Sequence, residues 1–190
     1  MSRCLRRRLP KGATSTVAAL AIVFASSWLA PRTLASGRGA AAPVAARACD
    51  AKVKPAKLNF TLKDLAGQKV ALADLKGKVI ILDFWATWCI PCRTEIPGFV
   101  ALQAKYADRG LQIVGVSVDD PPDKLKPYVA QMQMNYPVLQ GKDHGDLLDA
   151  FGPIPSIPVS VVIGRDGSIC TKHIGIAPME TFEQELEGLL

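Results

Sequence analysis

Apolar residues follow two kinds of pattern along this chain, and the patterns predict strands and helices in turn. Continuous apolar runs at 79–85 and 111–118 are typical of strands that are buried on both faces of a sheet. A third buried strand is expected at 159–163, and a tight Asp-Gly turn joins it to a fourth strand at 169–174. The first two strands should be parallel, because a helix lies between them, and the last two antiparallel.

Helical spacing of apolar residues fills the segments between these strands. In the first helix, Ile96, Phe99 and Leu102 recur at three-residue intervals, and Gly110 follows where a helix would end. Pro122 is placed at the start of the second helix, where its missing N–H costs nothing. The predicted helices cover residues 92–108, 122–132, 146–151 and 178–190.

Two short alternating segments precede the first long strand. Residues 59–62 and 69–72 predict a β-hairpin with its turn at 66–68. Behind this hairpin the order of elements is β-α-β-α-β-β-α. That order predicts an α/β fold with a central mixed sheet flanked by helices.

The first 35 residues differ from the rest in charge and hydropathy. They contain six basic residues, no acidic residue, and an apolar run from Val17 to Ala30 that is followed by small residues. This arrangement predicts a signal peptide or an uncleaved signal anchor at 1–35, with a mitochondrial leader as the competing interpretation. Residues 36–57 are rich in Ala, Gly and Pro and are expected to form a flexible tether, which leaves 58–190 as the folded domain.

The net charge of +6 does not indicate a nucleic-acid partner. The six basic residues of the leader account for all of it, because the remaining 17 basic residues balance the 17 acidic ones. A domain without net charge lacks the electrostatic attraction on which nucleic-acid binding depends.

Two cysteines, Cys89 and Cys92, lie between the first long strand and its helix. A thiolate at a helix N-terminus is stabilised by unpaired N–H groups, so Cys89 is expected to be the exposed nucleophile. Cys92 lies one turn further along and should face inward as the resolving thiol. The pair predicts a cycle in which Cys89 attacks a substrate disulfide and Cys92 then forms the Cys89–Cys92 disulfide.

Two carboxyl groups are candidates to take the proton of Cys92. Asp83 lies inside an apolar strand, where a buried acid without a partner costs free energy, and such acids are often found at functional sites. Glu95 follows Cys92 by three residues and therefore lies on the neighbouring helical turn. Either group could relay the proton directly or through water.

Three segments around and after the cysteines form a joint pattern: LDFWATWCIPC at 82–92, Glu-Ile-Pro at 95–97, and Gly-Val-Ser-Val-Asp at 115–119. This pattern resembles the thioredoxin superfamily, and in particular its membrane-linked TlpA/ResA-like branch. The resemblance covers about residues 58–190. Asp83 departs from the branch, which usually has Asn at this position, and is closer to thioredoxin itself.

The resemblance implies a thioredoxin-like fold and a site that needs no cofactor or metal. It implies a cis-proline facing the cysteines, which Ile157-Pro158 matches. The implied partners are disulfide-containing exported proteins, apocytochrome c among them, and a membrane thiol that donates electrons. The implied location is the periplasm or the outer face of the cytoplasmic membrane. The residues expected to form the substrate groove are Trp88, Ile90, Pro91, Ile157 and Pro158.

Other interpretations of the cysteines remain open. A thiol peroxidase of the same fold usually has Pro-x-x-x-Thr-x-x-Cys, but Leu82 and Ala86 occupy the Pro and Thr positions before Cys89. A metal chaperone, for copper for example, would use the same pair, although no Met or His cluster accompanies it. Cys170 is predicted to be a packed small residue, and a disulfide with Cys49 is a minor alternative.

Overall fold

The computed structural model describes residue 49 and residues 54–190. The predicted leader at 1–35 lies outside the described residues, as does most of the predicted tether at 36–57. Among the residues described, no helix has the length and apolar character needed to cross a membrane.

A five-stranded mixed sheet forms the centre of the domain, with strand order β5-β4-β3-β6-β7. β3, β4 and β5 are parallel, whereas β6 is antiparallel to both β3 and β7. A separate hairpin pairs β1 (Thr61–Lys63) with β2 (Lys69–Ala71). The strands of the large sheet are β3 (Val79–Trp85), β4 (Leu111–Ser117), β5 (Val138–Gln140), β6 (Val159–Ile163) and β7 (Ile169–Ile174).

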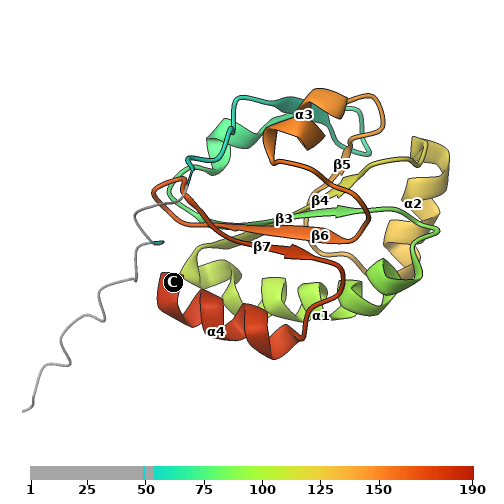
Figure 1. Ribbon diagram of the computed structural model, residues 1–190. Helices are drawn as coiled ribbons and strands as arrows, with labels where there is room; N and C mark the ends of the chain where they lie inside the picture. Colours follow the sequence, from blue (N-terminus) through green and yellow to red (C-terminus); the bar gives the residue numbers. More distant parts are fainter. Residues whose placement is uncertain (1–48, 50–53) are drawn as a thin grey trace, which may run out of the picture. The chain divides into compact units, whose positions relative to one another are not determined.

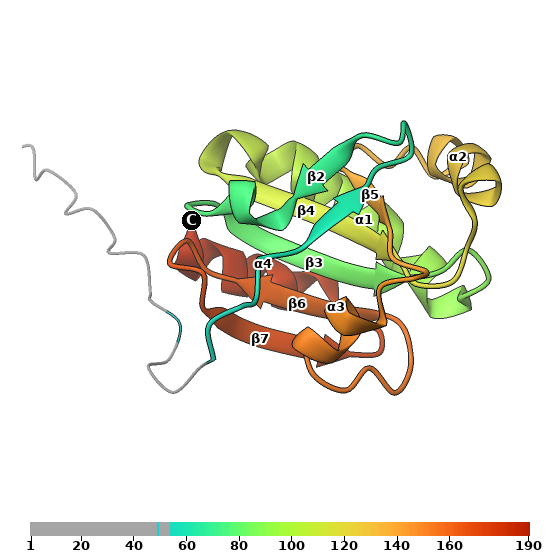
Figure 2. The same cartoon turned by 90° about the horizontal axis from the view of Figure 1, so that it is seen from above.

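Helices cover the sheet unequally on its two faces (Figures 1 and 2). α1 (Ile90–Tyr106) and α4 (Met179–Leu189) lie together on one face, and α3 (Gly145–Ala150) and the β1–β2 hairpin lie on the other. α2 (Pro122–Gln131) follows β4 and packs near the end of the sheet where β3 meets α1. The architecture confirms the α/β thioredoxin-like fold with an N-terminal hairpin.

The sequence of β3 explains its central place. All seven residues are buried, and they alternate between two apolar cores because successive side chains of a strand point to opposite faces. Ile80, Leu82 and Phe84 pack under the hairpin and α3, whereas Val79 and Ile81 pack under α1 and α4. Asp83 therefore points to the same face as Val79 and Ile81.

One strand of the sheet, β5, is missing from the sequence prediction. It has three residues and forms the edge of the sheet beside β4. Three residues are too few to show an alternation of apolar and polar positions. The strand is defined by its parallel pairing with β4, which begins at Gly115 and Val138.

Residues 54–56 are hydrogen-bonded to the turn between β6 and β7. The Ala56 N–H donates to the Gly167 carbonyl at 2.8 Å, and the Ile169 N–H donates to the Lys54 carbonyl at 3.2 Å. Residues 54–56 are thus held against the β6–β7 turn, although they fall within the segment predicted to be a tether.

A second disulfide joins Cys49 to Cys170, across 121 residues of sequence. The prediction that Cys170 is merely a packed residue is therefore wrong, and the pairing that had seemed a minor alternative is present. Cys170 lies at the start of β7, which is the end of the sheet away from Cys89. The sequence gives no sign of the pairing, because Cys49 and Cys170 are 121 residues apart and meet only in the folded domain.

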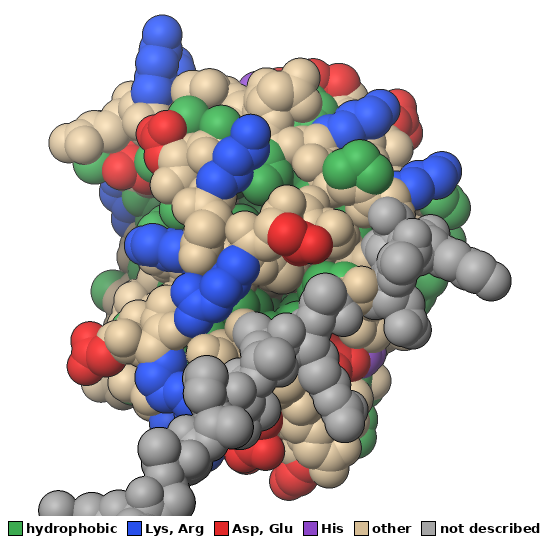
Figure 3. All heavy atoms as spheres, turned by 90° about the vertical axis from the view of Figure 1, so that its left-hand side faces the viewer, with side chains coloured by type: hydrophobic (Ala, Val, Ile, Leu, Met, Phe, Trp, Pro, Cys, Tyr) green, Lys and Arg blue, Asp and Glu red, His purple; other side chains and the backbone are tan. Residues whose placement is uncertain are grey.

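Charged side chains of both signs are interspersed on the face that carries the β6–β7 turn and the C-terminus (Figure 3). Arg165 connects three segments there, because its guanidinium donates to the carbonyls of Gly77, Arg109 and Leu190. Arg165, in the β6–β7 turn, thus links the segment before β3, the segment after α1 and the C-terminus.

Candidate active site

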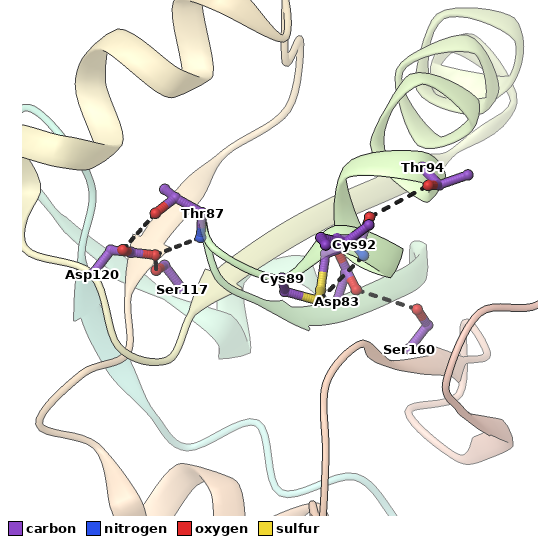
Figure 4. Close-up of a disulfide and its surroundings, with 9 residues drawn as sticks. Asp83, Thr87, Cys89, Cys92, Thr94, Ser117, Asp120 and Ser160 are labelled. Carbon is purple, nitrogen blue, oxygen red and sulfur yellow. Dashed lines mark hydrogen bonds between the residues drawn. A yellow bond between two sulfur atoms is a disulfide. The ribbon is translucent and has the colours of Figure 1, made fainter.

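Cys89 is the N-cap residue of α1, in the loop that follows β3. Its sulfur accepts the N–H of Cys92 at 3.2 Å, so the first turn of the helix points a backbone donor at it. The structure joins Cys89 and Cys92 in a disulfide, with 5.3 Å between their Cα atoms (Figure 4). A thiolate released at Cys89 would meet the same N–H group and the positive end of a 17-residue helix.

The disulfide is less accessible than the sequence suggests. Cys89 was expected to expose its sulfur, but the residue is only 3% exposed, and Cys92 is 1% exposed. Both pack in an apolar cluster with Trp85 and Ile96. The exposed groups are the neighbours of Cys89, since Trp88 is 61% and Ile90 is 74% exposed.

Asp120 holds the loop before Cys89 in place. Its carboxylate accepts the Thr87 N–H and the Thr87 hydroxyl, each at 2.6 Å, and the Ser117 hydroxyl at 3.3 Å (Figure 4). The neighbouring Asp119 accepts the indole N–H of Trp88 at 3.1 Å. The loop is therefore fixed by the segment that follows β4, on the adjacent parallel strand.

Asp83 is buried beneath α1 and has one hydrogen-bond partner among the described side chains, the Ser160 hydroxyl at 3.3 Å. Burial raises the pKa of Asp83 well above its ordinary value, and the negative charge of Glu95 raises it further. The Ser160 hydrogen bond lowers it by less. Asp83 therefore favours the protonated state over a wider range of pH than an exposed aspartate.

Glu95 is also buried, although it belongs to α1 and could have been a surface acid. It is 2% exposed, and its Oε1 atom accepts the Ala177 N–H at 3.0 Å. Its other oxygen, Oε2, has no hydrogen-bond partner among the described residues. Burial raises the pKa of Glu95, whereas the Ala177 N–H and the positive charge of His173 lower it.

The predicted groove residues separate into two groups. Trp88 and Ile157 line an apolar cavity of about 450 Å³ together with Val118, Leu148 and Ile154. The other group consists of Pro91, which lies in the first turn of α1, and Pro158, which is buried and follows a cis Ile157–Pro158 peptide bond, as the family resemblance implied.

Sequence reasoning missed the polar residues that support the site. Asp120 and Thr87 were not singled out, nor were Ser160 and the His173–Glu185 pair. For Asp120 a signal existed, since two aspartates end the strand that is parallel to the one carrying the cysteines, and parallel strands end at the same edge of a sheet. For Ser160 the signal appears only when its register with Asp83 is known.

Among the residues that the structure describes, no group of three or more His, Cys, Asp or Glu side chains is arranged to hold a metal ion. In β7, Cys170 bonds to Cys49, whereas His173 pairs with Glu185.

Comparison with known proteins identifies the family of this chain. A family model described as the AhpC/TSA family matches residues 53–172. The chain belongs to the AhpC/TSA family.

Individual relatives add the reaction class. Thiol-disulfide oxidoreductase ResA of Bacillus thuringiensis subsp. konkukian (strain 97-27) is 36% identical over 131 residues, which span 69% of this chain and 75% of the relative. Thioredoxin-like protein YneN of Bacillus subtilis (strain 168) is 34% identical over 132 residues, or 68% of this chain and 75% of that protein.

A solved structure matches the whole described domain. The crystal structure of a thiol:disulfide interchange protein, a thioredoxin family protein from Chlorobium tepidum TLS, has a TM-score of 0.67 and 34% sequence identity. The match covers 74% of this chain and 98% of that one. The prediction that this AhpC/TSA family member is a thiol–disulfide oxidoreductase with a thioredoxin-like fold is confirmed.

Proposed function

We propose that the protein reduces disulfides of exported proteins through a dithiol–disulfide cycle at Cys89 and Cys92. The observation that carries the proposal is the Cys89–Cys92 disulfide at the N-terminus of α1, with the Cys92 N–H directed at the Cys89 sulfur. In the reduced protein this donor stabilises a thiolate on Cys89, which is the attacking form of cysteine.

The cycle has two exchange steps. The Cys89 thiolate attacks one sulfur of a substrate disulfide and forms a mixed disulfide, and the other substrate sulfur leaves as a thiolate. Cys92 then loses its proton and attacks Cys89. The bond between Cys89 and the substrate breaks, the second substrate sulfur leaves as a thiolate, and the protein holds the Cys89–Cys92 disulfide again.

Asp83 and Glu95 take the proton of Cys92 in this account. Both are buried on the α1 side of the sheet, and burial raises the pKa of each. A raised pKa makes a carboxylate a better base for a thiol, because the two groups then hold the proton with more similar affinity. Oε2 of Glu95, which lacks a partner among the described residues, is an acceptor without a competing donor.

The substrate binds as an extended chain beside the cysteines. Trp88 and Ile90 offer exposed apolar surface on either side of Cys89, and the cavity lined by Trp88 and Ile157 lies next to it. The Ile157–Pro158 peptide bond is cis, and in this proposal it borders the substrate chain opposite the cysteine pair, as the family resemblance implies. An apolar side chain near the substrate cysteine fits this surface better than a charged one.

The cellular setting follows from the leader and the family resemblance. Residues 1–35 export the domain or anchor it, so the reaction takes place in the periplasm or on the outer face of the cytoplasmic membrane. A membrane thiol protein supplies electrons, and apocytochrome c, before haem attachment, is one of the exported substrates. The chemistry needs no cofactor and involves no nucleic acid.

Measuring the reduction potential of the Cys89–Cys92 pair tests the proposed direction. The purified protein is equilibrated with dithiothreitol or glutathione buffers, and the thiols are trapped and counted by mass spectrometry. A reductant should have a potential near the value of about −270 mV for thioredoxin. A potential near the value of about −120 mV for DsbA would overturn the proposed direction and make the protein an oxidant.

A further inference from the structure

A polar row crosses the middle of the sheet on the face covered by α1 and α4. Strand pairing places Asp83 beside Ser160, and Ser160 beside His173. Registered partners in neighbouring strands point to the same face, so all three side chains point toward the two helices. The next row on this face is apolar and contains Ile113, Ile81 and Val162.

The row runs from the buried centre toward solvent. Asp83 and Ser160 are each 1% exposed, whereas the side chains of His173 and Glu185 are 15% and 22% exposed. His173 Nε2 lies 3.1 Å from both carboxylate oxygens of Glu185, and the imidazole packs on Phe182 at 4.7 Å between ring centroids. β7 and α4 thus hold the imidazole in one position at the outer end of the row.

Three carboxyl groups face His173 from the elements packed around it. Glu185 of α4 contacts it, and Asp83 of β3 lies beyond Ser160 in the same row. Glu95 of α1 is buried on this side of the sheet and accepts the N–H of Ala177, in the segment between β7 and α4. Lys172 is its neighbour in sequence but points away, since its ammonium group donates to the carbonyls of Phe151 and Pro153. His173 is therefore placed between the two buried carboxyls and the solvent.

The proposed cycle needs a route by which a proton passes between the buried carboxyls and the solvent. Each oxidation of the pair removes the proton of Cys92, and each reduction returns it. When Cys92 loses its proton, an O–H bond forms on Asp83 or Glu95 as the S–H bond breaks, yet both carboxyls are covered by protein. An imidazole can accept a proton on one nitrogen and release it from the other, and so can pass a proton between buried and exposed groups.

We propose that His173, held by Glu185, is the positioning residue through which Asp83 and Glu95 exchange the Cys92 proton with solvent. This inference rests on the proposed function, because it concerns the proton of the resolving thiol. In one direction the proton moves from the buried carboxyl along Ser160 to the imidazole and then to solvent beside Glu185. On reduction it returns by the same groups.

An aromatic disulfide, dithiobis(nitrobenzoate), separates the two exchange steps. The reduced protein releases one coloured thiolate when Cys89 attacks the reagent, and a second when Cys92 attacks the mixed disulfide on Cys89. Both rates are followed in the same mixing experiment from about pH 5 to about pH 9. The variants are His173→Gln and Glu185→Gln, with His144→Gln as control, because His144 is the chain's other histidine and is paired with Asp146 on the surface.

The first release should keep its rate in all three variants. The second release should slow by about tenfold in His173→Gln, less than the roughly 10²- to 10⁴-fold contributed by a direct acid–base group, because His173 acts through the carboxyls. Its pH profile should lose an ionisation, and Glu185→Gln should shift that profile. Imidazole added to His173→Ala should restore the second release, which a role in packing alone would not explain.

Other results overturn the inference in distinguishable ways. An unchanged second release and pH profile in His173→Gln, with native circular dichroism, would mean that the proton leaves by another route. Slowing without a changed profile and without rescue by imidazole would reduce His173 to a packing role. Loss of both releases in the wild-type protein would instead contradict the proposed function itself.

Discussion

At the scale of single residues, two acidic side chains are buried near the disulfide, although Asp and Glu usually lie at the surface. Asp83 and Glu95 are each almost completely buried, and among the described residues each accepts one hydrogen bond, from Ser160 and Ala177 respectively. A buried carboxyl without a counter-charge costs stability when it is ionised. The protein tolerates this cost at the two positions from which the proposed cycle moves the proton of Cys92.

Replacing Asp83 by Asn should stabilise the fold at neutral pH. A raised pKa in the folded state means that stability is full below the unfolded pKa of about 3.9 and falls as pH rises through the folded pKa. Asn stays neutral and should remove this fall, with a gain of about 1–3 kcal/mol at pH 7. Urea denaturation of both proteins at several pH values measures this difference in the free energy of unfolding.

The matched control for this change is Asp108→Asn, which removes the same charge at an exposed position after α1. It should leave the dependence of stability on pH nearly unaltered. If Asp83→Asn and the wild-type protein lose stability equally as pH rises, the carboxyl of Asp83 is not held in an unfavourable environment. In kinetic experiments the same Asp83→Asn variant should slow the attack by Cys92 and spare the attack by Cys89.

At the scale of elements, the cysteine loop is built between two parallel strands. β3 delivers the chain to Cys89, and the segment after β4 supplies Asp120, which accepts three hydrogen bonds from Thr87 and Ser117. The position of the disulfide relative to the sheet therefore depends on a neighbouring strand as well as on α1.

Removal of Asp120 should loosen this loop. Asp120→Ala leaves the Thr87 N–H and the Thr87 and Ser117 hydroxyls without their acceptor, at a cost of about 1–3 kcal/mol for unsatisfied buried groups. It should also slow disulfide exchange, because the N-cap of α1 is less well positioned. Denaturation midpoints and insulin reduction rates measure the two effects.

Asp119→Ala is the control for Asp120. It removes one hydrogen bond to the exposed Trp88 and should cost less than about 1 kcal/mol. Equal losses in the two variants would contradict the assignment of the loop's support to Asp120.

At the scale of the whole molecule, the two disulfides lie at opposite ends of the sheet. Cys89–Cys92 closes a loop of three residues at the start of α1, whereas Cys49–Cys170 joins residues 121 apart at the β6–β7 end. Residues 54–56 also pair with that turn, so covalent and hydrogen bonds hold the start of the domain in the same place.

The Cys49–Cys170 bond should contribute to stability and leave the exchange chemistry unchanged. Closing a long loop restricts the unfolded chain, and a contribution of about 2–4 kcal/mol is typical. Cys49→Ala, Cys170→Ala and the double variant should therefore unfold at the same lowered temperature, with normal reduction of insulin. If the single losses simply add in the double variant, the two cysteines are not bonded to each other.

Features of the fold and the site that depend on local sequence could be predicted, whereas those that depend on contacts between segments far apart in sequence could not. β3 and β4 were predictable because strands buried on both faces are apolar throughout, and Cys89, Cys92 and Asp83 stand out locally. The contacts that complete the site join distant segments: Ser160 lies 77 residues from Asp83, and Ala177 lies 82 residues from Glu95. Their register is set by packing of the whole sheet, which no local pattern encodes.

The most direct test of the account is to trap the mixed disulfide. Cys92→Ser removes the proposed resolving thiol, so a disulfide-containing peptide should remain bonded to Cys89, where peptide mapping by mass spectrometry would find it. Cys89→Ser should form no such adduct. An adduct that forms on Cys92 in the Cys89→Ser protein, or no adduct in either variant, would contradict the assignment of Cys89 as the nucleophile and Cys92 as the thiol that releases the product.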